Sequence, residues 1–391
     1  MREVVIVDVA RTAIGKYAGA MAELSARELG AAAISGLLKR TGLDAGKIDH
    51  VIMGCVLQNG PNAYVARTSA LTAGIPDTVP ALTVNRLCGS ALEAINQAAR
   101  LIQCGEADVC VAGGVEQMSG APYFVPTGRW GARMGDTTMV DSMVSVLTDP
   151  FHNYHMGCTA ENVAKKHAIS REEQDEFALR SQTLTAAAVE KGYFDSQIVP
   201  VEITVKKEKI AFDKDEGVRK SITIEDLKKL KPAFEKGGTV TPGNSSTIND
   251  AASVAMLMEK DVAKALGLVP MCKMVSWAVA GLDPAYMGLG PALAVPKALA
   301  KAKLSLNDID VHELNEAFAA QALGVLRELK LECDRVNPNG GAISLGHPIG
   351  ATGAILMGKV ANELVRTKKE WGMVSMCIGG GQGIATIVQR I

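Results

Sequence analysis

A set of landmarks occurs twice along the chain, and this repetition constrains the fold more than any other feature of the sequence. Residues 43–54 read as a turn that leads into a strand, and residues 304–315 repeat that layout after an Ala- and Lys-rich segment, with Asp49 matching Asp310. A layout that recurs at such a distance within one chain is typical of an internal duplication. The two parts of the chain are therefore expected to fold alike.

Two later landmarks recur in the same order. A strand-to-helix junction at Cys88 has a counterpart in the Gly-rich junction at His347, and residues 109–117 have a counterpart in residues 375–383. Each half thus alternates strands with helices, which predicts an α/β sheet covered by helices. If the halves pack sheet beside sheet, the two junctions face each other, and ligands bind such folds at the carboxyl ends of strands. The duplication therefore predicts one site shared by both halves.

The stretch after the first half breaks this pattern. Gly, Pro and Met are frequent there, a capping box at Ser170 and Glu173 predicts a helix through residue 191, and charged segments follow. From Asp250 an Ala- and Met-rich segment is expected to return the chain to the core as a helix. These features predict a first half, an inserted loop domain and a second half, with the bounds 1–117 plus 249–267, 118–248 and 268–391.

The charge and cysteine content exclude several classes of protein. The 391 residues include 41 Lys and Arg against 42 Asp and Glu, so no overall field attracts nucleic acid or an anionic membrane. The eight cysteines are scattered singly, without the paired spacing of zinc ligands, which fits a reducing compartment. No signal peptide, membrane-length apolar run or peroxisomal C-terminus is present. We expect a soluble cytoplasmic protein.

Cys88 is the first candidate for chemistry, because it stands between the strand-like residues 80–84 and the helical pattern of residues 91–102. A helix N-terminus favours an anion, so this position is expected to lower the pKa of the Cys88 thiol by about 1. Gly89 and Ser90 leave the first N–H groups of the helix free to face an oxyanion. The alternative is a small core cysteine without function.

Three further clusters stand near the C-terminus. His347 precedes a helix in a Gly-rich stretch that lacks the Walker A lysine, and its unperturbed pKa of about 6.5 suits a base that deprotonates a thiol. Cys377 ends an apolar strand ahead of three glycines, where a tight turn with a spectator cysteine is the alternative. Asn315 ends a strand and opens a helix, and it could serve as a plain N-cap.

Together these clusters resemble the thiolase family. The matching motifs are NRLCGS around Cys88, NEAF from Asn315, GHPIGATG from Gly346 and CIGGGQG from Cys377, in the family's order and spacing. YHMG, AENVA and PGNSS in the inserted block extend the resemblance to essentially the whole chain. It implies a thiolase-like duplicated αβαβα layered core with an inserted loop domain.

The resemblance also implies the role of each catalytic residue. Cys88 would be the nucleophile that takes an acyl group from acyl-CoA, with His347 accepting its proton. Cys377 would remove a proton from the α-carbon of a second acyl-CoA. Asn315 would hold a water that forms one oxyanion site with His347, and the N–H groups of Cys88 and Gly379 would form the other. No metal or redox cofactor is required, since coenzyme A is part of the substrate.

Further positions match family contacts to the substrate. A basic stretch between residues 206 and 220 would lie over the CoA phosphates, although such a run is also typical of a solvated hairpin. Two methionines would close the acyl end of the pocket in a short-chain enzyme, although methionines also fill cores. The positions that the resemblance assigns to the substrate are His155, Met156, Arg219, Ser246, Met287 and Phe318.

The resemblance favours an acetyl-CoA C-acetyltransferase that interconverts two acetyl-CoA with acetoacetyl-CoA and CoA. A longer-chain 3-ketoacyl-CoA thiolase of β-oxidation is the nearest alternative, and an inactive CoA-binding or scaffold subunit is an alternative of another class. The inactive subunit is disfavoured because all four residues expected to be catalytic are present, namely Cys88, Asn315, His347 and Cys377. A homotetramer built as a dimer of dimers is expected, as in the family.

Overall fold

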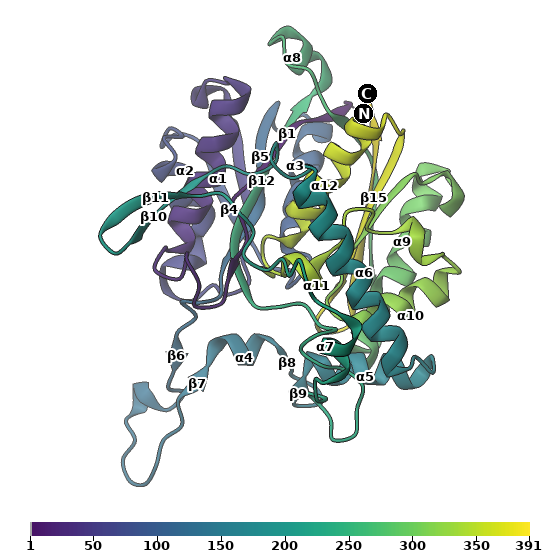
Figure 1. The fold of residues 1–391 in the computed structure, drawn as a ribbon. Helices are drawn as coiled ribbons and strands as arrows, with labels where there is room; N and C mark the ends of the chain where they lie inside the picture. Colours follow the sequence, from purple (N-terminus) through teal and green to yellow (C-terminus); the bar gives the residue numbers. More distant parts are fainter. Residues whose placement is uncertain (1) are drawn as a thin grey trace.

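The computed structural model describes residues 2–391 and contains one ten-stranded mixed sheet at its centre (Figure 1). Its order is β14-β15-β16-β13-β1-β12-β5-β3-β4, with the short β2 beside β12. The first half contributes β1 (Val4–Arg11), β2 (Gly15–Lys16), β3 (His50–Gly54), β4 (Ala81–Val84), β5 (Val109–Gln117) and β12 (Asn249–Glu259). The second half contributes β13 (Cys272–Gly281), β14 (Val311–Leu314), β15 (Trp371–Ile378) and β16 (Gln382–Arg390).

The strands of the two halves form two half-sheets, which are joined into one sheet because β1 pairs with β13 at Val5 and Ile6. The helices form three layers, one between the half-sheets and one on the outer face of each. The central layer is α3 (Ser90–Cys104) and α12 (Thr352–Thr367), whose apolar faces share one core with strands of both halves. The outer helices are α1 (Ala26–Thr41) and α2 (Val65–Thr72) on the first half and α9 (Gly290–Ala302) and α10 (Ala319–Leu329) on the second. The duplicated, layered α/β fold expected from the sequence is confirmed.

The duplication is visible in individual hydrogen bonds. The Asp49 carboxylate accepts from the N–H groups of Asp108 and Val109 at 2.7 and 2.9 Å, at the start of β5. The matching Asp310 accepts from Glu370 and Trp371 at 3.0 and 2.9 Å, at the start of β15. In both halves the strand after this aspartate runs parallel to the next long strand, β3 to β5 and β14 to β15. Each half is thus built by the same local rules.

One element prediction was wrong. The Ala- and Met-rich segment from Asp250 is not a helix but β12, a fully buried strand between β1 and β5. A strand covered on both faces has no alternation of polar and apolar residues, so its pattern resembles that of a buried helix. The pairing of β12 with both neighbours along its length outweighs the helix propensity of alanine and methionine.

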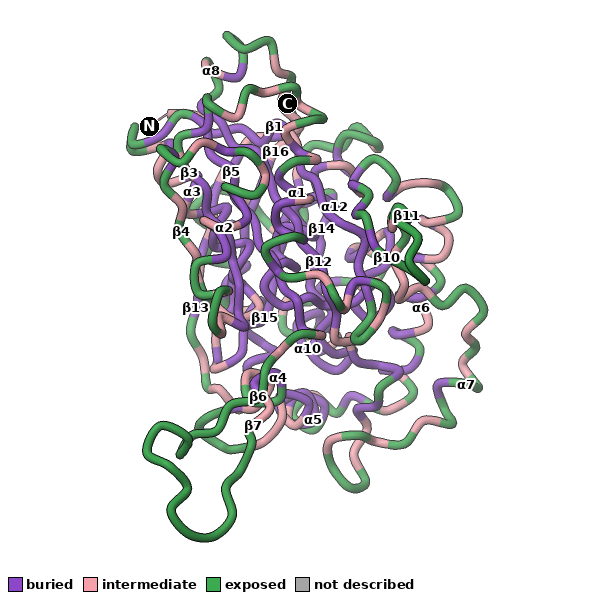
Figure 2. Tube along the Cα trace, turned by 90° about the vertical axis from the view of Figure 1, so that its left-hand side faces the viewer, coloured by how far each residue is buried: buried purple, intermediate pink, exposed green. Residues whose placement is uncertain are grey.

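Residues 118–248 lie outside the sheet. Their elements are β6 (Tyr123–Phe124), β7 (Val140–Asp141), α4 (Ser142–Val146), β8 (Thr148–Asp149), β9 (Tyr154–His155), α5 (Met156–Lys166), α6 (Arg171–Glu190), β10 (Val201–Val205), β11 (Glu208–Phe212) and α7 (Ile224–Lys228). The segment around β6 and β7 projects from the body as an exposed arm (Figure 2). We propose the sequence-based bounds as domain bounds, since β12 re-enters the sheet at Asn249.

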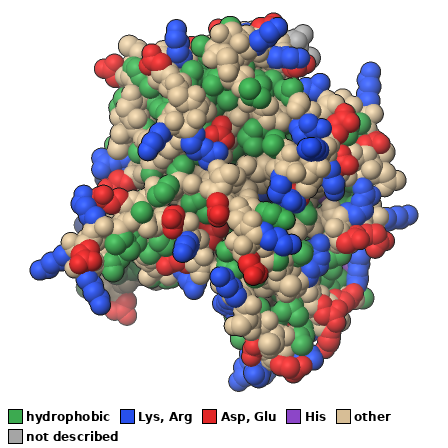
Figure 3. Space-filling view, turned by 45° about the horizontal axis from the view of Figure 1, so that its top comes forward, with side chains coloured by type: hydrophobic (Ala, Val, Ile, Leu, Met, Phe, Trp, Pro, Cys, Tyr) green, Lys and Arg blue, Asp and Glu red, His purple; other side chains and the backbone are tan. Residues whose placement is uncertain are grey.

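The remaining elements are short. The helix α8 (Lys260–Ala265) follows β12, and α11 (Ala342–Leu345) precedes the His347 junction. The described part of the chain also contains six 3₁₀ helices: Ala45–Lys47, Gly60–Tyr64, Gly128–Trp130, Pro284–Leu289, Leu306–Asp308 and Cys333–Arg335. On the face shown in Figure 3, cationic and anionic side chains are interspersed. Within residues 2–391, no helix has the length and apolar character needed to cross a membrane.

Candidate active site

The two duplicated junctions open onto one cavity of about 580 Å³, a size typical of a small-molecule site. Cys88 reaches it from the loop before α3, His347 from the loop before α12, and Cys377 from the end of β15. Gly379 lines the same cavity. Helices α3 and α12 pack against each other between the half-sheets, so residues that are more than 250 positions apart in the sequence line one wall.

Cys88 lies in the tight turn between β4 and α3, directly after Leu87, whose φ of 45° is left-handed. The N–H groups of Gly379 and of Cys88 itself point at its sulfur. The sequence-based prediction of a lowered pKa was wrong, because burial raises the pKa of this thiol to about 11 despite these two donors. Loss of hydration outweighs the helix N-terminus, so Cys88 is a neutral thiol at rest.

His347 is held in one tautomer. The Thr352 hydroxyl gives its only hydrogen to the Pro348 carbonyl at 2.9 Å, so it accepts from Nδ1 of His347 at 2.7 Å. The other ring nitrogen, Nε2, is therefore left without a proton and can act as a base. Burial lowers the pKa of His347 to about 4, which corrects the sequence-based assumption of an ordinary histidine. The imidazole is neutral at physiological pH.

Asn315 is not the N-cap that the sequence left open, because α10 begins four residues later with Phe318 at its N-cap position. Its backbone N–H donates to the Ser375 carbonyl at 2.9 Å, and its side-chain Nδ2 lies 3.4 Å from Nε2 of His347. Its Oδ1 is buried and has no hydrogen-bond partner among residues 2–391. The amide thus presents a donor to the base and keeps a buried acceptor without a protein partner among residues 2–391.

Cys377 is buried among apolar side chains, and it lines the same cavity as Cys88. Burial, followed by the neighbouring Cys88, raises the pKa of the Cys377 thiol. Gly379 lies between the loops that carry Cys88 and Cys377. A Cβ atom at this position would lie 3.2 Å from the side chain of Leu87 and 3.2 Å from that of Met156. Glycine at this position therefore leaves its N–H accessible from the cavity.

The substrate residues predicted by resemblance all line this cavity. Met156, Met287 and Phe318 form one apolar cluster with Cys377. His155 stacks on Phe234, with ring centroids 4.7 Å apart, and Phe234 meets Phe318 edge-on at 6.0 Å. The wall on the Cys377 side is thus made of aromatic rings and methionines.

Of the cationic residues in the predicted stretch, one lines the cavity. Arg219 lines the cavity, and its backbone N–H donates to Gln182 on α6 at 3.2 Å. Lys206, Lys207 and Lys209 lie on the β10–β11 hairpin, which packs on the outer layer of the first half and does not line the cavity. The solvated-hairpin alternative is correct for these lysines, because the strand pairing carries them away from the site.

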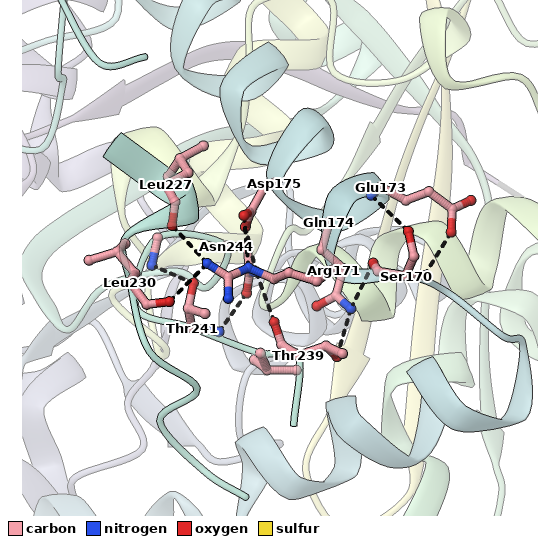
Figure 4. A network of polar contacts seen from close by, with 12 residues as sticks. Ser170, Arg171, Glu173, Gln174, Asp175, Leu227, Leu230, Thr239, Thr241 and Asn244 are labelled. Atoms are coloured by element: carbon pink, nitrogen blue, oxygen red, sulfur yellow. Dashed lines mark hydrogen bonds and ion pairs between the residues drawn. The ribbon is translucent and has the colours of Figure 1, made fainter. Parts of the chain in front are cut away.

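A buried polar network positions the loop that carries Ser246 (Figure 4). Asn244 donates to the Asp175 carboxylate at 2.9 Å, and its backbone carbonyl accepts from Ala319 at the start of α10. Arg171 fixes Asp175 from the preceding turn of α6 at 2.7 Å. The Ser246 hydroxyl and N–H both donate to the Ala317 carbonyl at 3.0 Å. The cavity wall is thereby tied to the segment that follows Asn315.

Sequence reasoning missed several residues that shape this site. Thr352 sets the tautomer of His347, and Asn249 fixes the loop by accepting from the His347 N–H at 3.0 Å. Phe234 and Gln182 line the cavity. A signal existed only for Thr352, which follows His347 by five residues inside the motif GHPIGATG. The others come from distant segments, and their contacts depend on the fold.

The arrangement combines a neutral thiol, a neutral imidazole with a free nitrogen, a second buried thiol and two convergent N–H groups. These groups can exchange an acyl thioester and abstract a nearby proton, since N–H donors stabilise the developing oxyanion. Among residues 2–391, no three or more His, Cys, Asp or Glu side chains are grouped to hold a metal ion.

Known proteins share both the sequence and the fold. Residues 4–261 match the thiolase N-terminal domain and residues 268–390 the thiolase C-terminal domain. The chain is 50% identical, over the full length of both proteins, to the beta-ketothiolase BktB of Cupriavidus necator and to an acetyl-CoA acetyltransferase of Pseudomonas aeruginosa.

Two solved structures superpose on nearly the whole chain. The acetyl-CoA acetyltransferase of Bacillus anthracis has a TM-score of 0.98 at 46% identity, covering 100% of this chain and 99% of its own. Human mitochondrial 3-ketoacyl-CoA thiolase in complex with CoA has a TM-score of 0.96 at 43% identity, covering 100% and 98%. The chain therefore belongs to the thiolase family and is an acyltransferase of the thiolase type.

Proposed function

We propose that the protein is an acetyl-CoA C-acetyltransferase that joins two acetyl-CoA reversibly into acetoacetyl-CoA and CoA. The observation that carries the proposal is the opening of Cys88, His347 and Cys377 onto one cavity, with Nε2 of His347 free to take a proton. Relatives that bear this name are 50% identical, and a related thiolase was solved with CoA bound. We assign CoA thioesters as substrates on the same grounds.

In the first half-reaction the Cys88 sulfur attacks the thioester carbonyl while His347 takes its proton. A preformed ion pair is disfavoured, since burial raises the pKa of Cys88 and lowers that of His347. The proton therefore moves together with bond formation. The N–H groups of Cys88 and Gly379 receive the oxyanion, and the CoA sulfur leaves with the proton of Cys377. The products are an acyl-enzyme, protonated His347 and a Cys377 thiolate.

In the second half-reaction the Cys377 thiolate removes a proton from the methyl group of a second acetyl-CoA. The enolate oxygen is stabilised by protonated His347 and by a water on Asn315, whose buried Oδ1 has no protein partner among residues 2–391. The new carbanion attacks the acyl group on Cys88. The Cys88 sulfur leaves and regains its proton from His347, so both thiols return to their resting state.

A longer-chain enzyme is the second candidate, because BktB and the human 3-ketoacyl-CoA thiolase are also close relatives. The packing around Cys377 favours an enzyme that acts on short acyl chains. Met156 is 7% exposed and Met287 is 3% exposed, and both fill the cavity wall beside the reacting groups. An inactive scaffold subunit has no support, since all four catalytic side chains converge.

We also propose a homotetramer. The exposed arm between β6 and β7 carries large apolar side chains that a lone protomer leaves in water, including Trp130 at 82% and Met134 at 97% exposure. Exposed apolar clusters of this kind mark association surfaces.

The two thiols have separable tasks, which variants can distinguish. Cys88→Ala should abolish any covalent acyl-enzyme. Cys377→Ala should still be acylated by acetyl-CoA but lose condensation by about 10²-fold or more, the usual effect of removing a general acid or base. Mass spectrometry of each variant after incubation with acetyl-CoA checks this. An adduct on Cys377 in the wild type, or none on Cys377→Ala, would reverse the assignment.

Arg219 is expected to hold the nucleotide end of CoA. Arg219→Ala should raise KM for acetyl-CoA and leave kcat nearly unchanged, because a remote contact stabilises the ground state and the transition state equally. Lys209→Ala, on the hairpin outside the cavity, is the matched control and should leave KM unchanged. Steady-state kinetics with acetyl-CoA and with acetyl-pantetheine checks this. An equal loss with the pantetheine thioester would refute the assignment.

The wall of methionines is expected to limit chain length. Each methylene beyond acetoacetyl must displace packed atoms, and overpacking costs about 1–3 kcal/mol. The enzyme should thiolyse acetoacetyl-CoA at least ~10-fold better in kcat/KM than 3-ketohexanoyl-CoA. Met156→Ala or Met287→Ala should narrow this gap. Comparable wild-type rates with 3-ketodecanoyl-CoA would instead identify a β-oxidation enzyme.

A further inference from the structure

A buried carboxylate outside the catalytic set lies where the two halves meet near the site. Glu116, near the end of β5, is 0% exposed. Its carboxylate accepts from the N–H groups of Val56 and Leu57 at 2.9 and 3.1 Å, and the Cys55 thiol donates to it at 3.6 Å. The segment after β3 is thus folded around this one side chain.

The same carboxylate contacts the second half. The backbone N–H of Gly350, three residues after His347, lies near enough to this carboxylate to favour its charged form. A side chain at Gly350 would lie 2.5 Å from the Glu116 carboxylate, and one at Gly114 would lie 2.0 Å from the Gly350 carbonyl. The loop that carries His347 is therefore pressed directly onto the end of β5, and glycine is required on both sides of the contact.

These contacts link Glu116 to the reacting groups. Val56, whose N–H donates to Glu116, and Ile349, which precedes Gly350, belong to one apolar cluster against which Cys88 packs. Both side chains also line the cavity. A shift of the carboxylate would therefore move the wall beside Cys88 and the loop of His347 together.

We propose that Glu116 is a positioning residue that, as a carboxylate, holds the His347 loop and the segment after β3 in register with Cys88. The inference rests on the proposed roles of Cys88 and His347. A carboxylate can accept from all three N–H groups, whereas a carboxylic acid turns one oxygen into a donor that faces an N–H. Loss of that acceptor leaves a buried N–H unpaired and loosens the register.

This requirement gives acylation a pH dependence. Burial raises the pKa of Glu116 to about 7, while that of His347 is lowered to about 4. Few other titratable groups face Glu116. They are the thiol of Cys55 and, at longer range, that of Cys88, whereas β12 places Ala251 opposite Glu116 and turns Asp250 toward Ser119. Acylation should therefore weaken as pH falls through about 7, because Glu116 gains a proton there and His347 does not.

The test is the rate of Cys88 acylation by acetyl-CoA, followed by rapid-quench mass spectrometry between pH 5.5 and 9. The acylation rate of the wild type should fall as the pH decreases through about 7, which gives its pH profile an acid limb. Glu116→Gln, which keeps the shape but cannot titrate, should lose that limb and acylate at least ~10-fold more slowly at pH 8. Glu116→Asp, which keeps the charge, should also be slowed but should retain a titrating limb. Glu363→Gln is the matched control.

The control is a buried carboxylate on α12 that accepts from Asn339 and Arg366, away from the cavity. It should keep the wild-type rate and limb. An unchanged limb or rate in Glu116→Gln would overturn the proposal, and if that variant does not fold, loss of the limb in Glu116→Asp would overturn it. If wild-type Cys88 is never acylated, the proposed function itself fails, so the two failures are distinguishable.

Discussion

The packing of α3 against α12 between the two half-sheets is the constraint on which the rest of the structure depends. The helices approach so closely that a side chain at Gly353 would meet the backbone of Leu92 at 2.4 Å. Each helix begins at the carboxyl-terminal edge of its own half-sheet. Close packing of the two helices therefore brings both N-terminal junctions to one point. The thiol and the base that we propose for catalysis are therefore supplied by equivalent positions of a duplicated unit.

Close packing buries the reacting groups, and this burial sets their protonation states at rest. The site holds two thiols and an imidazole that all remain neutral at rest, because desolvation raises the pKa of Cys88 and Cys377 and lowers that of His347. Charge then develops only during the reaction, where fixed N–H groups can stabilise it without reorganising. Thr352 and Asn244 fix the geometry of this site through hydrogen bonds without carrying a charge themselves.

Much of the fold could be predicted from the sequence because the duplication repeats local signals, such as Asp49 and Asp310, that act through nearby backbone groups. The residues that meet at the cavity could be named from the sequence because they lie in short motifs. What failed depended on tertiary context. The segment from Asp250 is a strand because two neighbouring strands pair with it. The pKa of Cys88 rises because burial desolvates its thiol. The role of Asn244 and the position of Glu116 arise from distant segments that no local pattern connects.

In the mechanism that we propose, Cys88 rests as a neutral thiol and gives up its proton to His347 only as the acyl group arrives. The decisive measurement is thiolate absorbance near 240 nm, taken as the difference between wild type and Cys88→Ala across pH. We expect no Cys88 signal at pH 7 and a rise only as pH approaches about 11. A thiolate signal that is already complete at neutral pH would show a preformed ion pair and overturn this mechanism.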